Sequence, residues 1–281
     1  ELLERSDIQV VEICTPPFLH ATQAVKAAGA GKHICVQKPM ARNVHECREI
    51  IEAAEKNKVK LILQFQYRFN DITVRARKLI DKGEIGKPLF SHFRGAISPN
   101  VAAGKQGGWI MDPEKSGGQL VEYNIHFYDL LRWYHGEVKS VYSETSRLVP
   151  IFKGKNPPYD HSIVTLRFKD DTLGVVAGTW SGSRDTPWNL GEVFGSKGVL
   201  HFRDTQNSFL SLQRDDKPEM SWASPRDGFS ERVAYFVECI REDKPVARST
   251  GVDGLRAVEV GVAAVESSEK HAPIGLPLRG Q

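Results

Sequence analysis

The chain has 281 residues, of which 40% are hydrophobic and 26% are charged, and its formal net charge is +3. This balance is typical of a globular protein with a sizeable core, arranged as one large domain or two ordinary ones. Lysine and arginine are not massed in runs and no apolar stretch approaches the roughly 20 residues that span a bilayer, which argues against nucleic-acid and membrane partners.

The first seventy residues alternate strands with helices. Apolar runs at 8–14, 33–36 and 59–65 predict strands, and the segments at 22–30 and 43–58 predict helices. The first helix ends at glycines, Gly29 and Gly31. Alternation of this kind predicts right-handed βαβ units and a parallel sheet.

The rhythm changes after residue 70. A helix at 74–82, a strand at 88–95 and a long polar loop at 100–118 come first, and Ser116 then caps one continuous helix from 118 to 135. Six strand-like segments and two closing helices follow, at 140–149, 162–168, 173–180, 190–194, 199–202, 209–212, 231–242 and 254–270. Runs of strands with short turns predict a mostly antiparallel or mixed sheet.

Polar side chains follow each of the three N-terminal strands. They are Thr15, Pro16 and Pro17 with His20 after the first, Gln37, Lys38 and Pro39 after the second, and Gln66, Tyr67 and Arg68 after the third. Ligands bind beyond the carboxyl ends of parallel strands, so these side chains predict a binding edge. A partly desolvated lysine there can assist proton transfer or orient a hydroxyl. Taken alone, Lys38 is better interpreted as a solvated lysine at a strand end, and it is the three polar strand exits together that favour the functional interpretation.

A second group of polar residues is Glu122, His126 and Asp129. Spacings of four and three place them on one face of the predicted helix. A histidine beside a carboxylate is suited to accept a proton from an alcohol. The alternative is a histidine satisfied at a helix–sheet boundary, or an exposed ion cluster. The other histidines offer no matching ligand set, so no metal site is expected.

Some signals are absent or weak. The sequence has no G-x-G-x-x-G, no phosphate-loop motif and no nucleophile elbow. The four cysteines, Cys14, Cys35, Cys47 and Cys239, are scattered without a C-x-x-C pair, which favours reduced thiols and a cytoplasmic location.

In this order, four motifs resemble those of the glucose–fructose oxidoreductase, inositol dehydrogenase and rhizopine-catabolism (Gfo/Idh/MocA) family. The motifs are Thr15-Pro16-Pro17-Phe18-Leu19-His20, Gln37-Lys38-Pro39-Met40, Gln66-Tyr67-Arg68-Phe69, and Gly117-Gly118-Gln119-Leu120-Val121-Glu122 with His126 and Asp129. Each motif is weak alone, whereas the ordered set is specific and covers essentially the whole chain.

The resemblance implies an α/β chain in two parts. Residues 1–67 would be the remainder of a Rossmann domain that binds NAD or NADP. Residues 68–281 would form an α+β substrate domain whose large, mostly antiparallel sheet commonly makes a homo-oligomer. The implied activity is hydride transfer between nicotinamide and a CH–OH group of a sugar, polyol or inositol-like substrate.

The resemblance also implies roles for residues. Lys38 would bind the reacting oxygen, His126 would be the acid/base, and Glu122 or Asp129 would orient the histidine. The cofactor contacts would be Thr15, Pro16, Pro17, His20, Gln37, Lys38, Pro39 and Arg68.

This sequence departs from the family pattern at three places. Gln37 and Glu122 replace the usual glutamate and aspartate, and the glycine-rich phosphate loop would precede Glu1, so we expect the beginning of the chain to be missing. Two alternatives therefore stay open: a non-catalytic binding or regulatory protein on the same fold, and an inactive fragment that lacks the dinucleotide phosphate loop.

Overall fold

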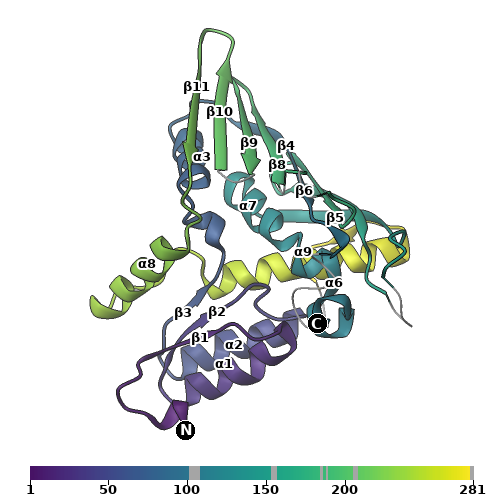
Figure 1. The fold of residues 1–281 in the computed structure, drawn as a ribbon. Helices are drawn as coiled ribbons and strands as arrows, with labels where there is room; N and C mark the ends of the chain where they lie inside the picture. The colour runs from purple at the N-terminus through teal and green to yellow at the C-terminus, as the bar shows by residue number, and fades with distance from the viewer. Residues whose placement is uncertain (101–107, 153–156, 184–185, 188, 205–207, 279–281) are drawn as a thin grey trace.

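The structure is a computed structural model that describes residues 1–100, 108–152, 157–183, 186–187, 189–204 and 208–278. It contains two sheets, and Figure 1 shows the long C-terminal helix α9 (Gly251–Lys270) running between them. The smaller sheet has three parallel strands in the order β1 (Val10–Ile13), β2 (His33–Val36) and β3 (Leu61–Leu63). The predicted parallel βαβ arrangement is confirmed.

Helices cover both faces of the small sheet. On one face, α1 (His20–Gly29) and α2 (Val44–Lys56) pack against Ile34 and Val36. On the other face, Phe236 of α8 (Phe229–Arg241) packs against Cys35 and Ile62. A parallel sheet needs apolar cover on both sides, and here the second cover comes from the far end of the sequence. The predicted boundary at residue 67 falls between β3 and the first strand of the larger sheet, and a C-terminal helix packs against the smaller sheet.

The larger sheet has nine strands. Their order is β11 (Lys217–Ser224), β10 (Ser208–Arg214), β9 (Val199–Asp204), β8 (Asn189–Gly195), β4 (Pro88–Ala96), β7 (Leu173–Thr179), β6 (His161–Phe168), β5 (Val138–Ser146) and β12 (Ile274–Gly275). Across the strands that the structure describes, only β4 and β7 run parallel, and all other neighbours are antiparallel, as expected from the runs of strands. Strand β11 was not predicted, because most of its residues are exposed and it lacks a regular alternation of apolar and polar residues.

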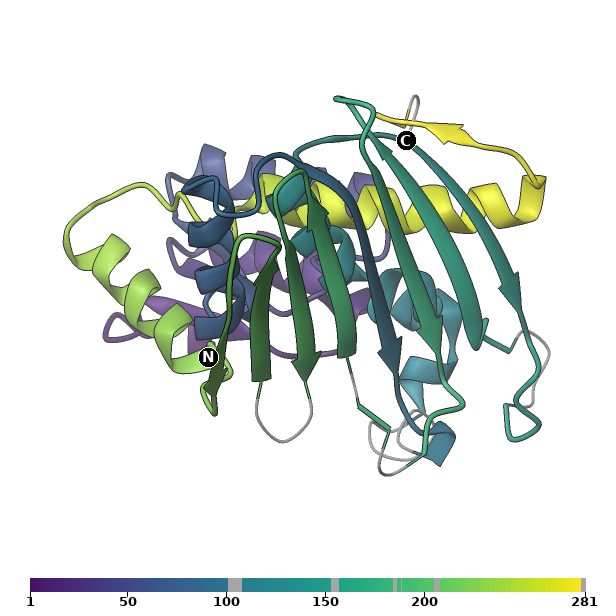
Figure 2. The ribbon, with the colours of Figure 1, turned by 90° about the horizontal axis from the view of Figure 1, so that it is seen from above.

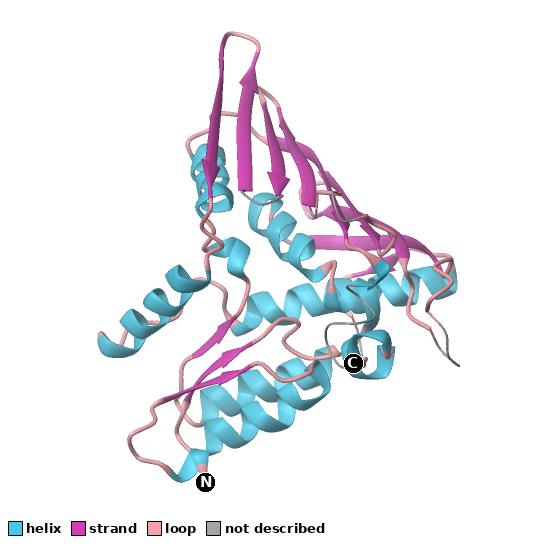
Figure 3. Cartoon of the chain, in the orientation of Figure 1, coloured by secondary structure: helices cyan, strands magenta, loops and turns pink. Residues whose placement is uncertain are grey.

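One face of the large sheet carries helices. Its inward side chains, such as Val164, Val176 and Val193, share a core with α7 (Ile125–His135) and α9, and α3 (Asp71–Asp81) lies toward β10 and β11. Figure 2 looks onto the sheet with α9 behind it, and among the described residues no helix covers the near face. Figure 3 separates the same layers by secondary structure. Within the described residues, every helix is too short or too polar to cross a membrane.

The predicted helix at 118–135 is wrong as one continuous element. It consists of α6 (Gly118–Glu122) and α7, with Tyr123 and Asn124 between them. The Asn124 side-chain amide donates to Ser162 Oγ at 2.9 Å, so a contact with the sheet holds the chain at the break.

The predicted loop at 100–118 also contains short helical turns. These are η4 (Trp109–Met111) and α5 (Pro113–Ser116), whereas residues 101–107 lie outside the described residues. Gly117 has a φ of +82°, and a Cβ there would also press on Val121 at 2.7 Å, so glycine is required where α5 turns into α6.

Candidate active site

Lys38 and Glu122 form an ion pair between the two parts of the chain. Lys38 follows β2, and its Nζ lies 2.5 Å from Glu122 Oε1 and 2.8 Å from the Glu122 carbonyl oxygen at the end of α6. The two side chains are only 14% and 7% exposed. A pair so desolvated holds its geometry strongly, since separating the charges would leave one of them buried and uncompensated.

A row of side-chain amides supports Lys38 from the sheet. The Lys38 N–H donates to Gln37 Oε1 at 2.9 Å, and the Gln37 amide donates to Gln64 Oε1 at 3.1 Å. Gln64 in turn donates to Glu12, which also accepts from Arg232 of α8 at 2.7 Å. The glutamine that replaces the family's usual glutamate thus anchors the Lys38 backbone through a neutral amide.

His126 lies in the first turn of α7, close enough to Lys38 for the ammonium charge to affect its titration. Burial, and secondly the charge of Lys38, holds the pKa of His126 well below its usual value of 6.5, so the ring is neutral at neutral pH. Its Nδ1 is buried and has no hydrogen-bond partner among the described residues. The Tyr67 ring meets the imidazole edge-on, with ring centroids 5.4 Å apart and planes at 65°.

Asp129 makes its hydrogen bonds to Arg68 and not to His126 Nδ1, so the predicted direct contact between carboxylate and imidazole is not made. Both Asp129 oxygens accept from Arg68, from Nε at 2.9 Å and Nη2 at 2.8 Å. Glu122 binds Lys38, and neither carboxylate reaches Nδ1 of the histidine within the described part of the chain. Helical spacing indicated that Glu122, His126 and Asp129 lie in one region. It could not show that each carboxylate forms an ion pair with a lysine or arginine distant in the sequence.

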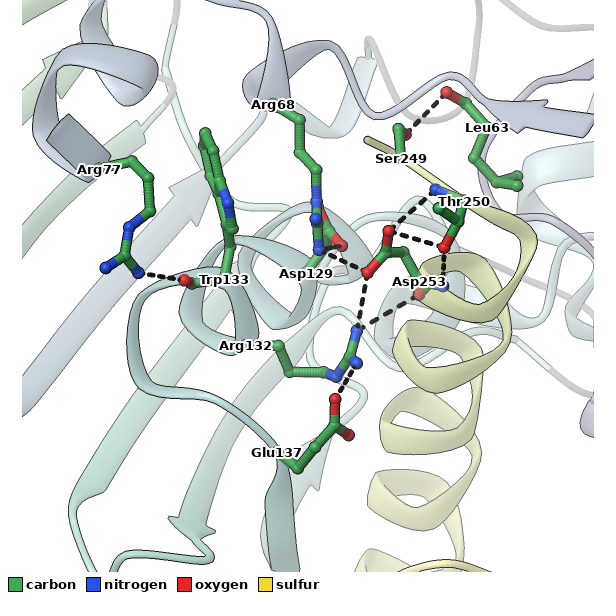
Figure 4. A network of polar contacts seen from close by, with 10 residues as sticks. All are labelled: Leu63, Arg68, Arg77, Asp129, Arg132, Trp133, Glu137, Ser249, Thr250 and Asp253. Carbon is green, nitrogen blue, oxygen red and sulfur yellow. Dashed lines mark hydrogen bonds and ion pairs between the residues drawn. The ribbon is translucent and has the colours of Figure 1, made fainter. Parts of the chain in front are cut away.

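Arg68, predicted as a cofactor contact, lies in a buried network of ion pairs. It is 7% exposed, and a second carboxylate, Asp253 at the start of α9, accepts from its Nη2 at 2.9 Å. Figure 4 shows Arg68 between Asp129 and Asp253, with Trp133 alongside. Burial opposes its charge, yet the two carboxylates together raise the pKa of Arg68.

His20 is buried behind the strand exits. Its Nε2 lies 2.7 Å from the Thr15 carbonyl oxygen, and its Nδ1 lies 3.0 Å from the Pro39 carbonyl oxygen. Burial lowers the pKa of His20. With both ring nitrogens engaged and the side chain 0% exposed, His20 joins the first and second strand exits and does not present a polar edge to a ligand.

The first strand exit is shaped by two prolines. Thr15 Oγ1 donates to Gln23 Oε1 at 2.8 Å, Pro16 is partly buried, and Pro17 is buried at the start of the turn that leads into α1. The second exit has its own proline, Pro39, joined to Lys38 by a cis peptide bond. Both exits open at the same edge of the sheet because β1 and β2 are parallel.

Three contributors were not predicted as site residues. Tyr67 stood in a quoted motif without a role, Gln64 lies inside the third apolar run, and Asn189, which donates to the Tyr67 hydroxyl, comes from β8. Only Tyr67 had a usable signal, since it immediately precedes Arg68 at a strand exit. No group of three or more His, Cys, Asp or Glu side chains in the described part of the chain is arranged to hold a metal ion.

The site thus combines an anchored ammonium group with a neutral imidazole, one ring nitrogen of which has no hydrogen-bond partner in the described part of the chain. The first can stabilise negative charge on an oxygen, and the second can accept a proton from a hydroxyl. This pairing is suited to interconverting an alcohol and a carbonyl group.

Known proteins share this arrangement of sequence and fold. Residues 1–65 match the model of the oxidoreductase family with an NAD-binding Rossmann fold, and residues 73–201 match the GFO/IDH/MocA C-terminal domain. The inositol 2-dehydrogenase of Salmonella paratyphi B is 32% identical over 278 residues, covering 96% of this chain and 77% of that protein. The myo-inositol 2-dehydrogenase of Thermotoga maritima is 29% identical over 287 residues, covering 98% and 82%.

The fold is similar as well. A levoglucosan dehydrogenase solved in complex with NADH and L-sorbose superposes with a TM-score of 0.86 at 24% identity, covering 98% of this chain and 82% of that one. With both halves matched in order and one relative above 30% identity, this chain belongs to the Gfo/Idh/MocA family of NAD-binding oxidoreductases.

Proposed function

We propose that the chain transfers a hydride between the nicotinamide of NAD and a CH–OH carbon of a sugar, polyol or inositol-like substrate. The observation that carries this proposal is the buried ion pair of Lys38 with Glu122, four residues before His126, whose Nδ1 has no hydrogen-bond partner among the described residues. Both groups lie at the strand-exit edge where a parallel sheet binds its ligand.

The residues at this edge fit a nicotinamide cofactor. The imidazole of His126, whose Nδ1 has no hydrogen-bond partner among the described residues, can accept the hydroxyl proton of an alcohol. The ammonium group of Lys38 can donate a hydrogen bond to the same oxygen, beside the nicotinamide ring. Thr15, Pro16 and Pro17 would line the cofactor from the first exit, and Gln37 with Pro39 would hold Lys38 from the second. Bound NAD supplies the carbon that accepts the hydride. The family's NAD-binding fold makes NAD the first cofactor to test and NADP the second.

The chain's own residues handle the proton and the charge. The unprotonated ring nitrogen of His126 takes the hydroxyl proton as the alcohol is oxidised, and returns it in the reverse direction. Lys38 Nζ donates a hydrogen bond to the same substrate oxygen and stabilises the charge that develops on it. Glu122 fixes the position of the ammonium group, and His20 ties the first two strand exits together.

The substrate class rests on the relatives. Two of them are named for dehydrogenating inositol and a third for levoglucosan, and all are polyhydroxylated rings. Asn189, whose amide donates to the hydroxyl of Tyr67 beside His126, would be one hydrogen-bonding partner for such a ring.

The direct test is a spectrophotometric assay of NADH formation with myo-inositol, scyllo-inositol and levoglucosan, using NAD and then NADP. We expect turnover that falls by roughly 100-fold or more in His126→Asn. Binding of NADH, followed by fluorescence, is measured on the same samples. Tight binding without any turnover would instead support the non-catalytic alternative, and absence of binding would support the inactive-fragment alternative.

We also propose that the uncovered face of the nine-stranded sheet is a homo-oligomer interface. Phe90, Ile163 and Leu173 are exposed large hydrophobic residues on its strands, and Phe90 and Leu173 are direct neighbours across β4 and β7. Light scattering after gel filtration should give at least a dimer, and Ile163→Glu should shift it toward the monomer. A reducing cytoplasm is the location we propose, since all four cysteines are free thiols.

A further inference from the structure

A network of buried charged side chains surrounds Arg68. Its guanidinium group makes a two-bonded contact with Asp129 and a third bond to Asp253, and these side chains are 8%, 2% and 17% exposed. Arg132, also buried, donates to Glu137 at 2.5 Å and reaches the Asp253 backbone at 3.5 Å (Figure 4).

The network joins three separate elements of the chain. Arg68 belongs to η3 (Gln66–Arg68), directly after β3, whereas Asp129 lies in the middle of α7. Asp253 lies in the first turn of α9, where its other oxygen accepts from the Thr250 backbone and hydroxyl at 2.9 Å each. Arg68 is therefore fixed from both sides, and it holds α7 at a defined distance from the end of β3.

Arg68 lies next to the proposed acid/base in two ways. Its chain neighbour Tyr67 contacts the His126 ring, and its partner Asp129 follows His126 by one helical turn. Within the described residues, His126 has no hydrogen bond at Nδ1 to orient it. Its position is therefore set by the placement of α7 and by the Tyr67 ring.

Because α6 and α7 are separate helices, the contact that fixes α6 does not also fix α7. Lys38 anchors Glu122 at the end of α6, but no continuous helix transmits that anchor to His126. Asp129, three residues after His126 in α7, forms an ion pair with Arg68, which follows β3. A flat guanidinium group that binds both carboxylate oxygens fixes orientation as well as distance, which a lysine ammonium group does not.

We infer that Arg68 is a positioning residue for His126: through Asp129 and Tyr67 it sets where the imidazole lies relative to Lys38. This inference rests on the proposed hydride-transfer function, and it replaces the expectation that Arg68 contacts the cofactor. Asp129 acts in the same way, through Arg68 and not through a bond to the histidine.

The test compares Arg68→Lys with the matched control Arg77→Lys. Arg77 also reaches α7, donating to the Trp133 carbonyl oxygen at 2.5 Å, but it lies farther along the helix and its carboxylate partner is Asp81 on its own helix. Both variants keep the positive charge. Asp129→Asn, which keeps the side-chain shape, is the second variant should Arg68→Lys fail to fold.

Two readouts are measured on folded protein. In the NADH assay, Arg68→Lys should lower kcat by about 10- to 100-fold, as expected when a reacting group is displaced by a fraction of an ångström to an ångström. The KM for NAD should stay within about two-fold, because Arg68 does not touch the cofactor. By NMR, the His126 ring resonance, assigned with His126→Asn, should titrate at a pKa shifted by about half a unit or more. Arg77→Lys should change neither readout.

Each contrary result has a separate meaning. If Arg68→Lys lowers only stability and leaves kcat and the His126 titration as in the native protein, the residue is merely structural and the inference is overturned. A higher KM for NAD at unchanged kcat would restore the cofactor-contact role. If the native chain shows no turnover, the proposed function fails, and the NMR titration still decides whether Arg68 positions His126.

Discussion

Replacing Lys38 with methionine should show how much the stability of the protein depends on the Lys38–Glu122 ion pair. The variant leaves the Glu122 carboxylate, 7% exposed, without its cation. Removing one partner of a buried pair costs about 3–5 kcal/mol of stability. Glu122 can instead take up a proton, which at about pH 7 costs about 3.7 kcal/mol for an ordinary glutamic acid and so limits the loss. Because the cost of protonation sets the loss, we expect Lys38→Met to lower the free energy of unfolding by about 3.7 kcal/mol at neutral pH.

The loss should depend on pH in a defined direction. In the variant, the folded chain binds a proton at Glu122 that the unfolded chain lacks above an ordinary carboxyl pKa. Lowering the pH therefore favours the folded variant over its own unfolded state, by about 1.4 kcal/mol per pH unit. At about pH 5 the difference from the native protein should shrink to about 1 kcal/mol.

Urea unfolding followed by tryptophan fluorescence measures the free energy of unfolding of the variant and of the native protein at both pH values. The double variant Lys38→Met/Glu122→Gln is the control, because it leaves no unpaired charge and should lie within about 1–2 kcal/mol of the native protein. The reasoning is refuted if Lys38→Met loses the same stability at both pH values, or if the two substitutions are simply additive.

Three further predictions concern two histidines and a glycine. The kcat/KM for alcohol oxidation should fall on acidification with a midpoint below 6.5, because burial and Lys38 hold the pKa of His126 low; a midpoint above 7 would contradict this. Burial lowers the pKa of His135 to about 4, so its neutral form stabilises the fold above its unfolded pKa and that contribution is lost as the pH falls. At about pH 5 the loss should be about 2 kcal/mol, and His135→Gln should remove that part of the acid sensitivity in urea unfolding; unchanged sensitivity would refute it. Gly95→Ala would place a Cβ 2.5 Å from the Tyr123 ring and should cost about 1–3 kcal/mol, whereas Gly29→Ala meets open space and should not destabilise; equal unfolding midpoints would argue against this packing.

The first part of the fold was predictable because its signals are local. Strand and helix periods alternate clearly up to residue 65, and parallel strands must open at one edge, so the sequence alone was enough to place the three exits together. The mostly antiparallel second sheet followed from its run of strands and turns. Strand β11 did not, since its side chains are largely exposed and carry no hydrophobic pattern.

The polar contacts of the site were not predictable, because the partners are distant in the sequence. Lys38 and Glu122 are separated by 84 positions, and Arg68 and Asp129 by 61. Spacing on a helix suggested that Glu122 or Asp129 would orient His126. Instead, Glu122 binds Lys38 and Asp129 binds Arg68. The helix break at Tyr123 and Asn124 likewise depends on a bond to the sheet, which no local propensity reveals.

Helix α9 contributes to two hydrophobic cores at once. Ala257 and Val258 fill the core of the small sheet, and Val260, Ala263 and Ala264 fill that of the large one. The halves are thus neither contiguous in the sequence nor separable with a single cut. A recombinant piece that ends near residue 67 would lack both α8 and α9 and would leave Ile34, Cys35 and Ile62 partly open to water. Swapping substrate domains between relatives would therefore require exchanging the start of this helix together with the strands it packs against.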